Sequence, residues 1–471
     1  MRQLLVLIGC FGAIAPSINA ATISFPQAWE IVQQDNNSLA AERANVDRYQ
    51  HLQEASSARN WPSITVGANY TYLDQDVTLS GRQIVNSTGA NITLPPSVAA
   101  SDLGAVISGL GDLTSTITER DIFSSSIRAM WPIFTGGRIS AAQSAATGQT
   151  QEAQSQLAME TQARFEDLSK YYFSVLLAQD VLQTRNLVVK GLNRHYENAL
   201  KLEQQGQIAR VERLQAESAL DRATIEQKKA RNNLKIAQNA LTQILNQNVM
   251  VEPGDSLFTN DHLPAMDTFV TQTLNTYPGL ALLDAKEKQA QSLIKAEKGK
   301  YYPNVYLYGD YSLYEDDSLA SQLKPDWLVG IGVSIPLIDN SGRGDNLAAA
   351  HSAVLQVRHK RAQAKQDLNV LVQKTYYQAQ QAQEEVSGLT SSLRLAKENL
   401  RLRQKAFSQG LSTSTDVVDA ELNLASVKTQ QATAKFHYVT ALSRLLALSN
   451  NMNDFAQYQI RSTAYQPTST H

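Results

Sequence analysis

The chain has 471 residues and 51.8 kDa, with 43% hydrophobic residues, 18% charged residues and a mean hydropathy of −0.29. Its 42 Lys and Arg are balanced by 44 Asp and Glu, which excludes the cationic surplus of a general nucleic-acid binder. Cys10 is the only cysteine, and beyond the first twenty residues no run of about 18 apolar residues occurs. A disulfide framework and a helical membrane protein are therefore excluded.

Residues 1–20 have the pattern of a secretory signal peptide. A short basic start is followed by the mostly apolar run Leu4 to Pro16, and small residues lead to a cleavage position after Ala20. Leu7-Ile8-Gly9-Cys10 resembles a lipoprotein cleavage box, but only nine residues precede the cysteine. We therefore expect cleavage after Ala20, which leaves a mature chain without cysteine, and whether Cys10 is ever lipidated stays open.

The first structural unit of the sequence spans residues 21–246. Helical periodicity over 26–59 gives way to alternating apolar residues over 61–75 and 122–135, which predict two strands. The intervening residues 76–121, rich in Gly, Ser and Thr, predict an external loop. A proline-free run over 138–205 would be about 100 Å long as a helix. Together with 208–246 it predicts a coiled-coil hairpin over 138–246, reversing at Gly206.

The same unit recurs in residues 267–450. At an offset of 204 positions, Gly206 aligns with Gly410 and Leu220 with Leu424, and a seven-residue apolar ladder keeps the same phase in both copies. The second copy predicts a helix near 267–299, strands at 302–315 and 326–338, and a hairpin over 345–449. Residues 247–266 would form a linker. Residues 451–471 would form a polar, loosely packed C-terminal tail.

The four strands share one apolar face that needs a membrane or a partner. Their alternate apolar positions begin at Ile64 and include Ile127 and Trp327, and Tyr and Trp flank them, as in transmembrane strands. A soluble hairpin packed on helices is the alternative. The smallest membrane barrels need eight strands, and an open edge in lipid costs several kcal/mol per group. The pattern therefore predicts either a dimer of eight strands or a trimer of twelve.

Several segments make the mature chain, about residues 22–450, resemble the TolC-like outer membrane factors of Gram-negative bacteria. The resemblance rests on Ser24-Phe25 with Asn36-Asn37-Ser38-Leu39, Asn60-Trp61-Pro62-Ser63, Trp131-Pro132-Ile133-Phe134-Thr135-Gly136-Gly137-Arg138, Tyr301-Tyr302-Pro303-Asn304, and Gly410 to Ala420. It implies a mainly α fold with a membrane β-barrel: long coiled-coil hairpins and four β-strands per chain. By analogy, a homotrimer would form a 12-stranded barrel in outer-membrane lipid and a 12-helix periplasmic tunnel.

The resemblance also implies a function and a site. The protein would be the outer-membrane channel of a tripartite export system, working with a periplasmic adaptor and an inner-membrane ABC-type or proton-driven pump. Asp416 and Asp419 match the paired aspartates of the periplasmic entrance, and Glu212 matches an acidic latch position. Phe407 and Ser412 stand where some relatives have Tyr and Arg, so the closing network should differ here. Adaptor contacts are expected at Gly206, Gln207, Ile208, Ala209 and Arg210 in the first tip, and at Gly410, Leu411, Ser412 and Thr413 in the second.

Other classes of function find little support in the residues. The seven histidines show no metal-ligand spacing, and no phosphate loop, nucleophile elbow or paired catalytic acids occur, so we expect no enzyme and no cofactor. A trimeric coiled-coil adhesin or spacer without a conducting lumen is the alternative function. A periplasmic adaptor would need one hairpin between β modules, whereas this chain has two hairpins. The cargo and the class of pump remain open.

Overall fold

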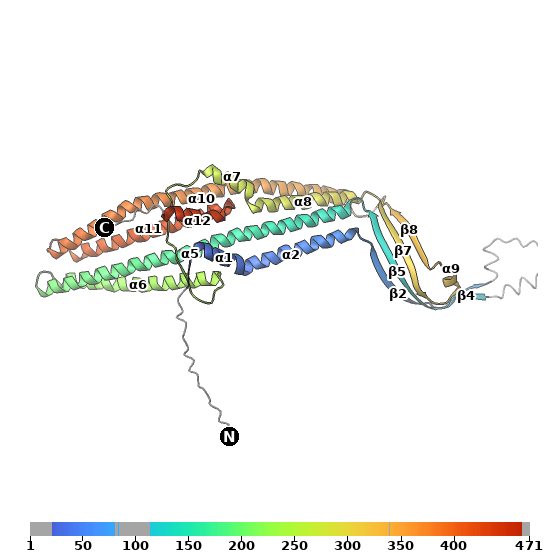
Figure 1. Ribbon diagram of the computed structural model, residues 1–471, viewed down its shortest axis with the longest axis horizontal. Helices are drawn as coiled ribbons and strands as arrows, with labels where there is room; N and C mark the ends of the chain where they lie inside the picture. The colour runs from blue at the N-terminus through green and yellow to red at the C-terminus, as the bar shows by residue number, and fades with distance from the viewer. Residues whose placement is uncertain (1–20, 81–82, 84–113, 339, 464–471) are drawn as a thin grey trace, which may run out of the picture. The chain divides into compact units, whose positions relative to one another are not determined.

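The computed structural model describes residues 21–80, 83, 114–338 and 340–463 (Figure 1). The predicted signal peptide, most of the loop 76–121 and the last eight residues lie outside the described residues. Residues 21–48, 151–285 and 357–463 form one compact unit, and residues 49–150 and 286–356 form a second. Each unit therefore contains chain from both sequence repeats. Within the described residues, every helix is too short or too polar to span a bilayer.

The helix expected at the start of each repeat is broken in two. In the first repeat, α1 (Phe25–Asp35) and α2 (Asn37–Ser57) meet at Asn36, whose side-chain oxygen accepts hydrogen bonds from the backbone N–H groups of Ser38 (3.0 Å) and Leu39 (3.2 Å). Asn36 thus caps the second helix. In the second repeat, α7 (Met266–Thr276) and α8 (Pro278–Gly299) meet at Tyr277, which is extended because a residue before proline avoids helical geometry.

Two long hairpins follow the strands of each repeat. The first joins α5 (Arg138–Gln204) to α6 (Arg210–Ile244), and the second joins α10 (Arg343–Ser408) to α11 (Ser414–Leu448). Figure 1 shows each long helix turning back into its shorter partner at a tight tip. The buried stripe of α5 follows the predicted ladder through Val175 and then shifts to Val188 and Leu192. Such a shift is expected where an α-helix of 3.6 residues per turn departs from a repeat of 3.5.

The four predicted strands form one antiparallel sheet in the order β2-β5-β7-β8. They are β2 (Ser63–Tyr72), β5 (Asp121–Phe134), β7 (Asn304–Glu315) and β8 (Trp327–Ser334). Short elements extend them: a 3-10 helix, η1 (Ala58–Asn60), the paired strands β3 (Val77–Ser80) and β4 (Thr114–Thr118), and α9 (Leu319–Leu323). The described ends of the loop 76–121 are thus partly strand.

The register gives the sheet one apolar and one polar face. Val66 pairs with Ile127, Ile127 with Tyr311, and Tyr311 with Trp327, so an apolar row crosses all four strands. Directly opposite residues point to the same face. One position along, Arg128 on the other face bonds Asp310 at 3.1 Å. The alternation in the sequence therefore predicted the apolar face correctly.

An aromatic core lies in the compact unit formed by residues 21–48, 151–285 and 357–463. It joins the first and the last described segments of the chain to the long helices. The strand β1 (Ala21–Ile23) pairs in parallel with β6 (Val251–Pro253) in the linker. After η2 (Met452–Asp454), the helix α12 (Phe455–Thr463) places Phe455 4.5 Å from Phe25, ring centroid to ring centroid, with only 2% of Phe455 exposed. The prediction of a loose polar tail from residue 451 was therefore wrong for residues 452–463, because Phe455 is buried in this core and Met452 and Tyr458 pack against it.

Candidate functional site

The two hairpin tips have the same backbone structure. Gly206 and Gly410 adopt φ of 69° and 71°, the left-handed conformation that favours glycine. In both tips the glycine N–H and the next N–H donate back to carbonyls of the last helical turn, at 2.9 to 3.0 Å. These bonds are those of the Schellman motif, so the predicted C-cap glycines are confirmed.

In the second tip, Asp416 caps its own helix. Its carboxylate accepts hydrogen bonds from the Thr413 backbone N–H (3.0 Å) and hydroxyl (2.8 Å) and from the Ser412 hydroxyl (3.0 Å), and it lies 3.3 Å from the Arg403 guanidinium. The Thr413 hydroxyl accepts from the Asp416 N–H in return, which completes a capping box. The bonds from Thr413, then that from Ser412, hold the pKa of Asp416 below its usual value, with Arg403 adding to the effect.

Asp419 lies one turn further along α11 and is exposed. Among the described residues it makes neither a hydrogen bond nor an ion pair. The two predicted entrance aspartates therefore differ: Asp416 is engaged in capping, whereas Asp419 presents its whole charge to solvent.

The predicted latch residue Glu212 reaches from the first tip to the second. Its carboxylate accepts a 2.6 Å hydrogen bond from the backbone N–H of Ser414, the first residue of α11. One turn along α6, the Gln215 side chain accepts a 3.1 Å bond from the Thr415 hydroxyl. A carboxylate at a helix N-terminus satisfies an N–H that lacks a helical partner and interacts favourably with the helix dipole.

A buried histidine makes a further connection between the hairpins. Nε2 of His195, on α5, lies 2.6 Å from the hydroxyl of Ser414, which is fully buried. The His195 ring packs against Phe407, with ring centroids 4.6 Å apart. Burial lowers the pKa of His195 from 6.5 to about 4, while the nearby Glu212 carboxylate acts in the opposite direction. The imidazole is therefore neutral at pH 7.

Next to these hydrogen bonds, apolar side chains pack the tip ends of α5, α6, α10 and α11 against one another. Ala199, Ala216, Phe407 and Val417, one from each long helix, form a buried cluster that also receives Ile208 of the first tip. Phe407 thus contributes packing where a tyrosine would contribute a hydroxyl.

The surface around the tips is basic and contains exposed apolar residues. A groove of about 420 Å³ between α5 and α10 is lined by Arg194 and Lys201 and by neutral groups, without a carboxylate among its lining residues. The last turns of α10, residues 394–405, carry five Lys and Arg against one Glu. Leu411 at the second tip is 78% exposed.

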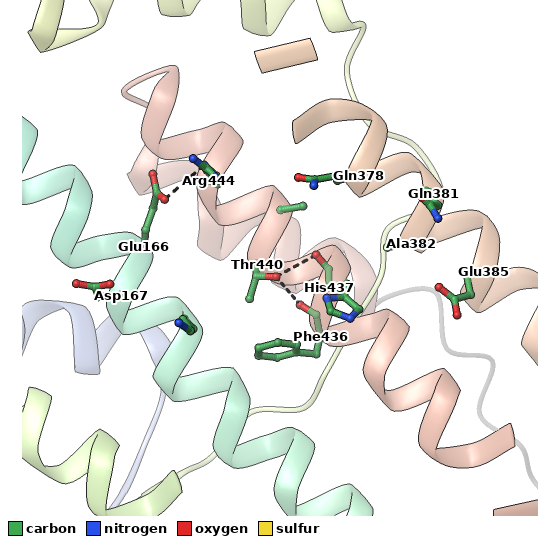
Figure 2. Close-up of a pocket in the computed structure, with 12 residues that line it drawn as sticks. Glu166, Asp167, Gln378, Gln381, Ala382, Glu385, Phe436, His437, Thr440 and Arg444 are labelled. Atoms are coloured by element: carbon green, nitrogen blue, oxygen red, sulfur yellow. Dashed lines mark hydrogen bonds and ion pairs between the residues drawn. The ribbon is translucent and has the colours of Figure 1, made fainter. Parts of the chain in front are cut away.

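A second hollow lies nearer the aromatic core. It lies between α5, α10 and α11 (Figure 2). Its volume is about 460 Å³. Glu166 and Arg444 form an ion pair across it at 3.7 Å, and burial raises the pKa of Glu166 against the opposing effect of Arg444. Its charges are mixed. Throughout the part of the chain that the structure describes, no cluster of His, Cys, Asp or Glu is arranged to hold a metal ion.

The structure therefore brings Glu212 into contact with the second tip and leaves Gly206, Gln207, Ala209, Arg210, Gly410 and Leu411 on exposed turns. Ser412 and Thr413 act as partners of Asp416. Sequence reasoning missed His195 and Ser414. A signal for His195 existed, because Val188, Leu192, His195 and Ala199 follow the spacing of a buried helix stripe.

Comparisons with known proteins agree with this architecture. The profile of a family described as "Outer membrane efflux protein" matches residues 30–247 and 270–451. The alkaline protease secretion protein AprF of Pseudomonas aeruginosa is 23% identical over 293 residues, and the aligned part spans 58% of each chain.

Solved structures agree over nearly the whole length. The open state of the Neisseria gonorrhoeae MtrE outer membrane channel has a TM-score of 0.70 and 18% identity, covering 93% of this chain and 94% of that one. A CusC structure has a TM-score of 0.72 and 16% identity, covering 91% and 92%. At such identities these structures show a shared fold alone.

Proposed function

The chain belongs to the outer membrane efflux protein family, and from this premise we propose that three copies form an export duct whose periplasmic entrance is gated by the hairpin tips. The observation that carries the proposal is the match of the family profile to each half of the chain separately. The protein is thus an outer-membrane efflux channel rather than an enzyme.

The sheet supports closure into a barrel with further copies of the chain, and the family fold favours three. Within the described residues, the outer edges of β2 and β8 lack a strand partner, and an unpaired edge is costly in lipid. Pairing β2 of one copy with β8 of the next would satisfy both edges. Three copies would supply twelve strands, with the row from Val66 to Trp327 facing lipid. The polar face, which includes Arg128 and Asp310, would face the lumen.

The hairpin tips support a gated entrance. Glu212, Gln215 and His195 all bond the N-terminal turn of α11, so the second hairpin can move away from the first only if these bonds break. In a trimer, three copies of Asp419 would add a ring of exposed carboxylates. Such a ring attracts cations and repels anions.

The tip surface supports docking of a periplasmic adaptor. The exposed side chains of Leu411 and Val211 offer apolar contact at the turns, and the basic end of α10 offers charge. Docking there would compete with the bonds between the hairpins and open the entrance. Energy would come from an ABC-type or proton-driven pump in the inner membrane, and co-purification of that pump would identify its class and cargo.

Single-channel recording in planar bilayers tests this function. We expect purified protein to migrate as a heat-sensitive trimer and to form cation-selective channels. Asp419→Asn should shift the reversal potential toward lower cation selectivity, because it removes the free carboxylate without disturbing the cap at Asp416. Asp221→Asn, which changes an exposed aspartate further along α6, is the matched control. A trimer without conductance would instead support the adhesin or spacer.

A further inference from the structure

Ser414 is the point at which the second hairpin is bonded to both helices of the first. Its backbone N–H donates to Glu212 of α6, and its hydroxyl bonds His195 of α5, each at 2.6 Å. Ser414 is fully buried and begins α11, so a displacement of this helix end would break both contacts. The position of the second tip therefore depends on two side chains of the first.

His195 is enclosed by groups that differ in charge on each side. Its own helix contributes Arg194 and Lys201 to the adjoining groove, α6 contributes the Glu212 carboxylate, and α10 contributes the uncharged Phe407. On α11, the Ser414 hydroxyl contacts the His195 ring. Glu421, further along α11, lies against Gly191, which is one turn before His195 on α5. Glu212 is already engaged by the Ser414 N–H.

Protonation of the His195 ring would change its hydrogen-bonding groups and its charge. A neutral imidazole offers one donor and one acceptor, whereas an imidazolium offers two donors and carries a charge that must leave water. Only 6% of His195 is exposed, and its ring lies against an aromatic ring. A charged ring is therefore more stable where the hairpins part and water reaches it.

We propose that His195 is a positioning residue of the gate: the neutral ring holds Ser414, and protonation in acid releases the second hairpin tip from the first. The inference rests on the proposed function, because it assigns a trigger to the same entrance. It adds a proton as a ligand that opens the duct without an adaptor.

The size of the effect follows from the pKa of His195 in the two states. In the closed tip the pKa of His195 is about 4, whereas a water-exposed imidazole has a pKa of about 6.5. The closed tip therefore loses stability as the pH falls from 6.5 toward 4. Linkage then predicts that the ratio of open to closed tips rises about 20-fold per chain between pH 7 and pH 5. Above pH 7 the ratio should not change through this group.

Single-channel recording at pH 7 and pH 5 tests the proposal with three proteins. Wild type should show an open probability that rises at pH 5. His195→Gln keeps a side chain that can bond Ser414 but cannot titrate in this range, and should lose that rise. His437→Gln, at an exposed histidine of α11 beside the other hollow, should keep it. A pH response that survives in His195→Gln, or is lost in His437→Gln, would overturn the proposal.

A measurement of distance separates this inference from the proposed function. Spin labels on cysteines introduced at Gln207 and Leu411, one exposed residue in each tip, report the separation of the tips in wild type and in His195→Gln. We expect the separation to grow at pH 5 in the wild-type background only. Equal separations at both pH values would overturn the trigger while leaving the channel intact. Failure to conduct at any pH, with tips that still part in acid, would overturn the channel but not the release by His195.

Discussion

The two hairpin tips have nearly the same backbone but different side-chain bonds. Both turn on a left-handed glycine, and both continue into a helix of 35 residues. Glu212 and Asp416 are equivalent at the offset of 204 positions, and each is the third residue of its helix. Yet Asp416 bonds its own N-cap residue, whereas Glu212 bonds the other hairpin.

One residue accounts for the difference. The N-cap residue is Thr413 in the second tip and Ala209 in the first. Alanine has no hydroxyl and cannot form the reciprocal bonds of a capping box. The Glu212 carboxylate, which is also one methylene longer, is thus available to the neighbouring helix. Equivalent carboxylates thus have different roles in the two repeats: Asp416 caps its own helix, and Glu212 connects the two hairpins.

The two tips should differ most in the stability lost when Phe407 and its equivalent in the first repeat, Glu203, are each replaced by alanine. Phe407 is buried in the cluster between the hairpins, whereas Glu203 forms a partly buried ion pair with Arg213 at 2.6 Å. We expect Phe407→Ala to lower the local free energy of opening of the tip by about 3 to 5 kcal/mol, because it leaves a cavity. Glu203→Ala should cost less, because Arg213 keeps a second carboxylate partner, Glu217, at 2.5 Å. Hydrogen exchange of tip amides measures both, and equal losses would contradict the comparison.

Glu212→Gln should have the next largest effect. The amide keeps the shape of the side chain and can still accept from the buried Ser414 N–H, but it loses the charge-assisted part of the bond and the interaction with the α11 dipole, which together should cost about 1 to 2 kcal/mol. Exchange should rise at the start of α11, on the hairpin that was not mutated. Glu217→Gln, one turn or more further along α6, is the control. A change confined to α6 would show that Glu212 does not bridge the tips.

Gly206→Ala and Gly410→Ala should instead affect both tips alike. Neither position has an atom within 4 Å of an added Cβ, so the cost is the left-handed backbone alone, about 1 to 2 kcal/mol each. Thermal unfolding followed by circular dichroism checks this. A large difference between the two variants would mean that one turn makes contacts that the other lacks.

The smallest expected effects come from exchanging the caps. Thr413→Ala should cost about 1 kcal/mol at the start of α11. Ala209→Thr should stabilise the start of α6 by completing a box with Glu212, while weakening the bond of Glu212 to Ser414. Exchange at residues 210–213 should therefore slow as exchange at Ser414 quickens. If exchange slows both at residues 210–213 and at Ser414, Glu212 can cap its own helix and still bond Ser414, which would contradict the comparison.

The sequence was sufficient to predict the hairpins, their glycine turns and the apolar face of the sheet, because repeat identities and periodicity agreed. The break before Pro278 was also visible in principle. The burial of Phe455 and the pairing of β1 with β6 could not be read from local patterns, since each depends on a distant segment. The same holds for Ser414, whose partners lie about 200 positions away in the chain.

The central claim is that the entrance opens only when the two tips separate. It can be tested by joining them. Gln215 and Thr415, whose side chains bond at 3.1 Å, can be replaced by cysteines and bridged with a short thiol-reactive cross-linker that a reductant cleaves. The account predicts that fully bridged channels stay at their lowest conductance, at pH 5 as well as pH 7, and recover on reduction. Bridged channels that open as readily as reduced ones would contradict it.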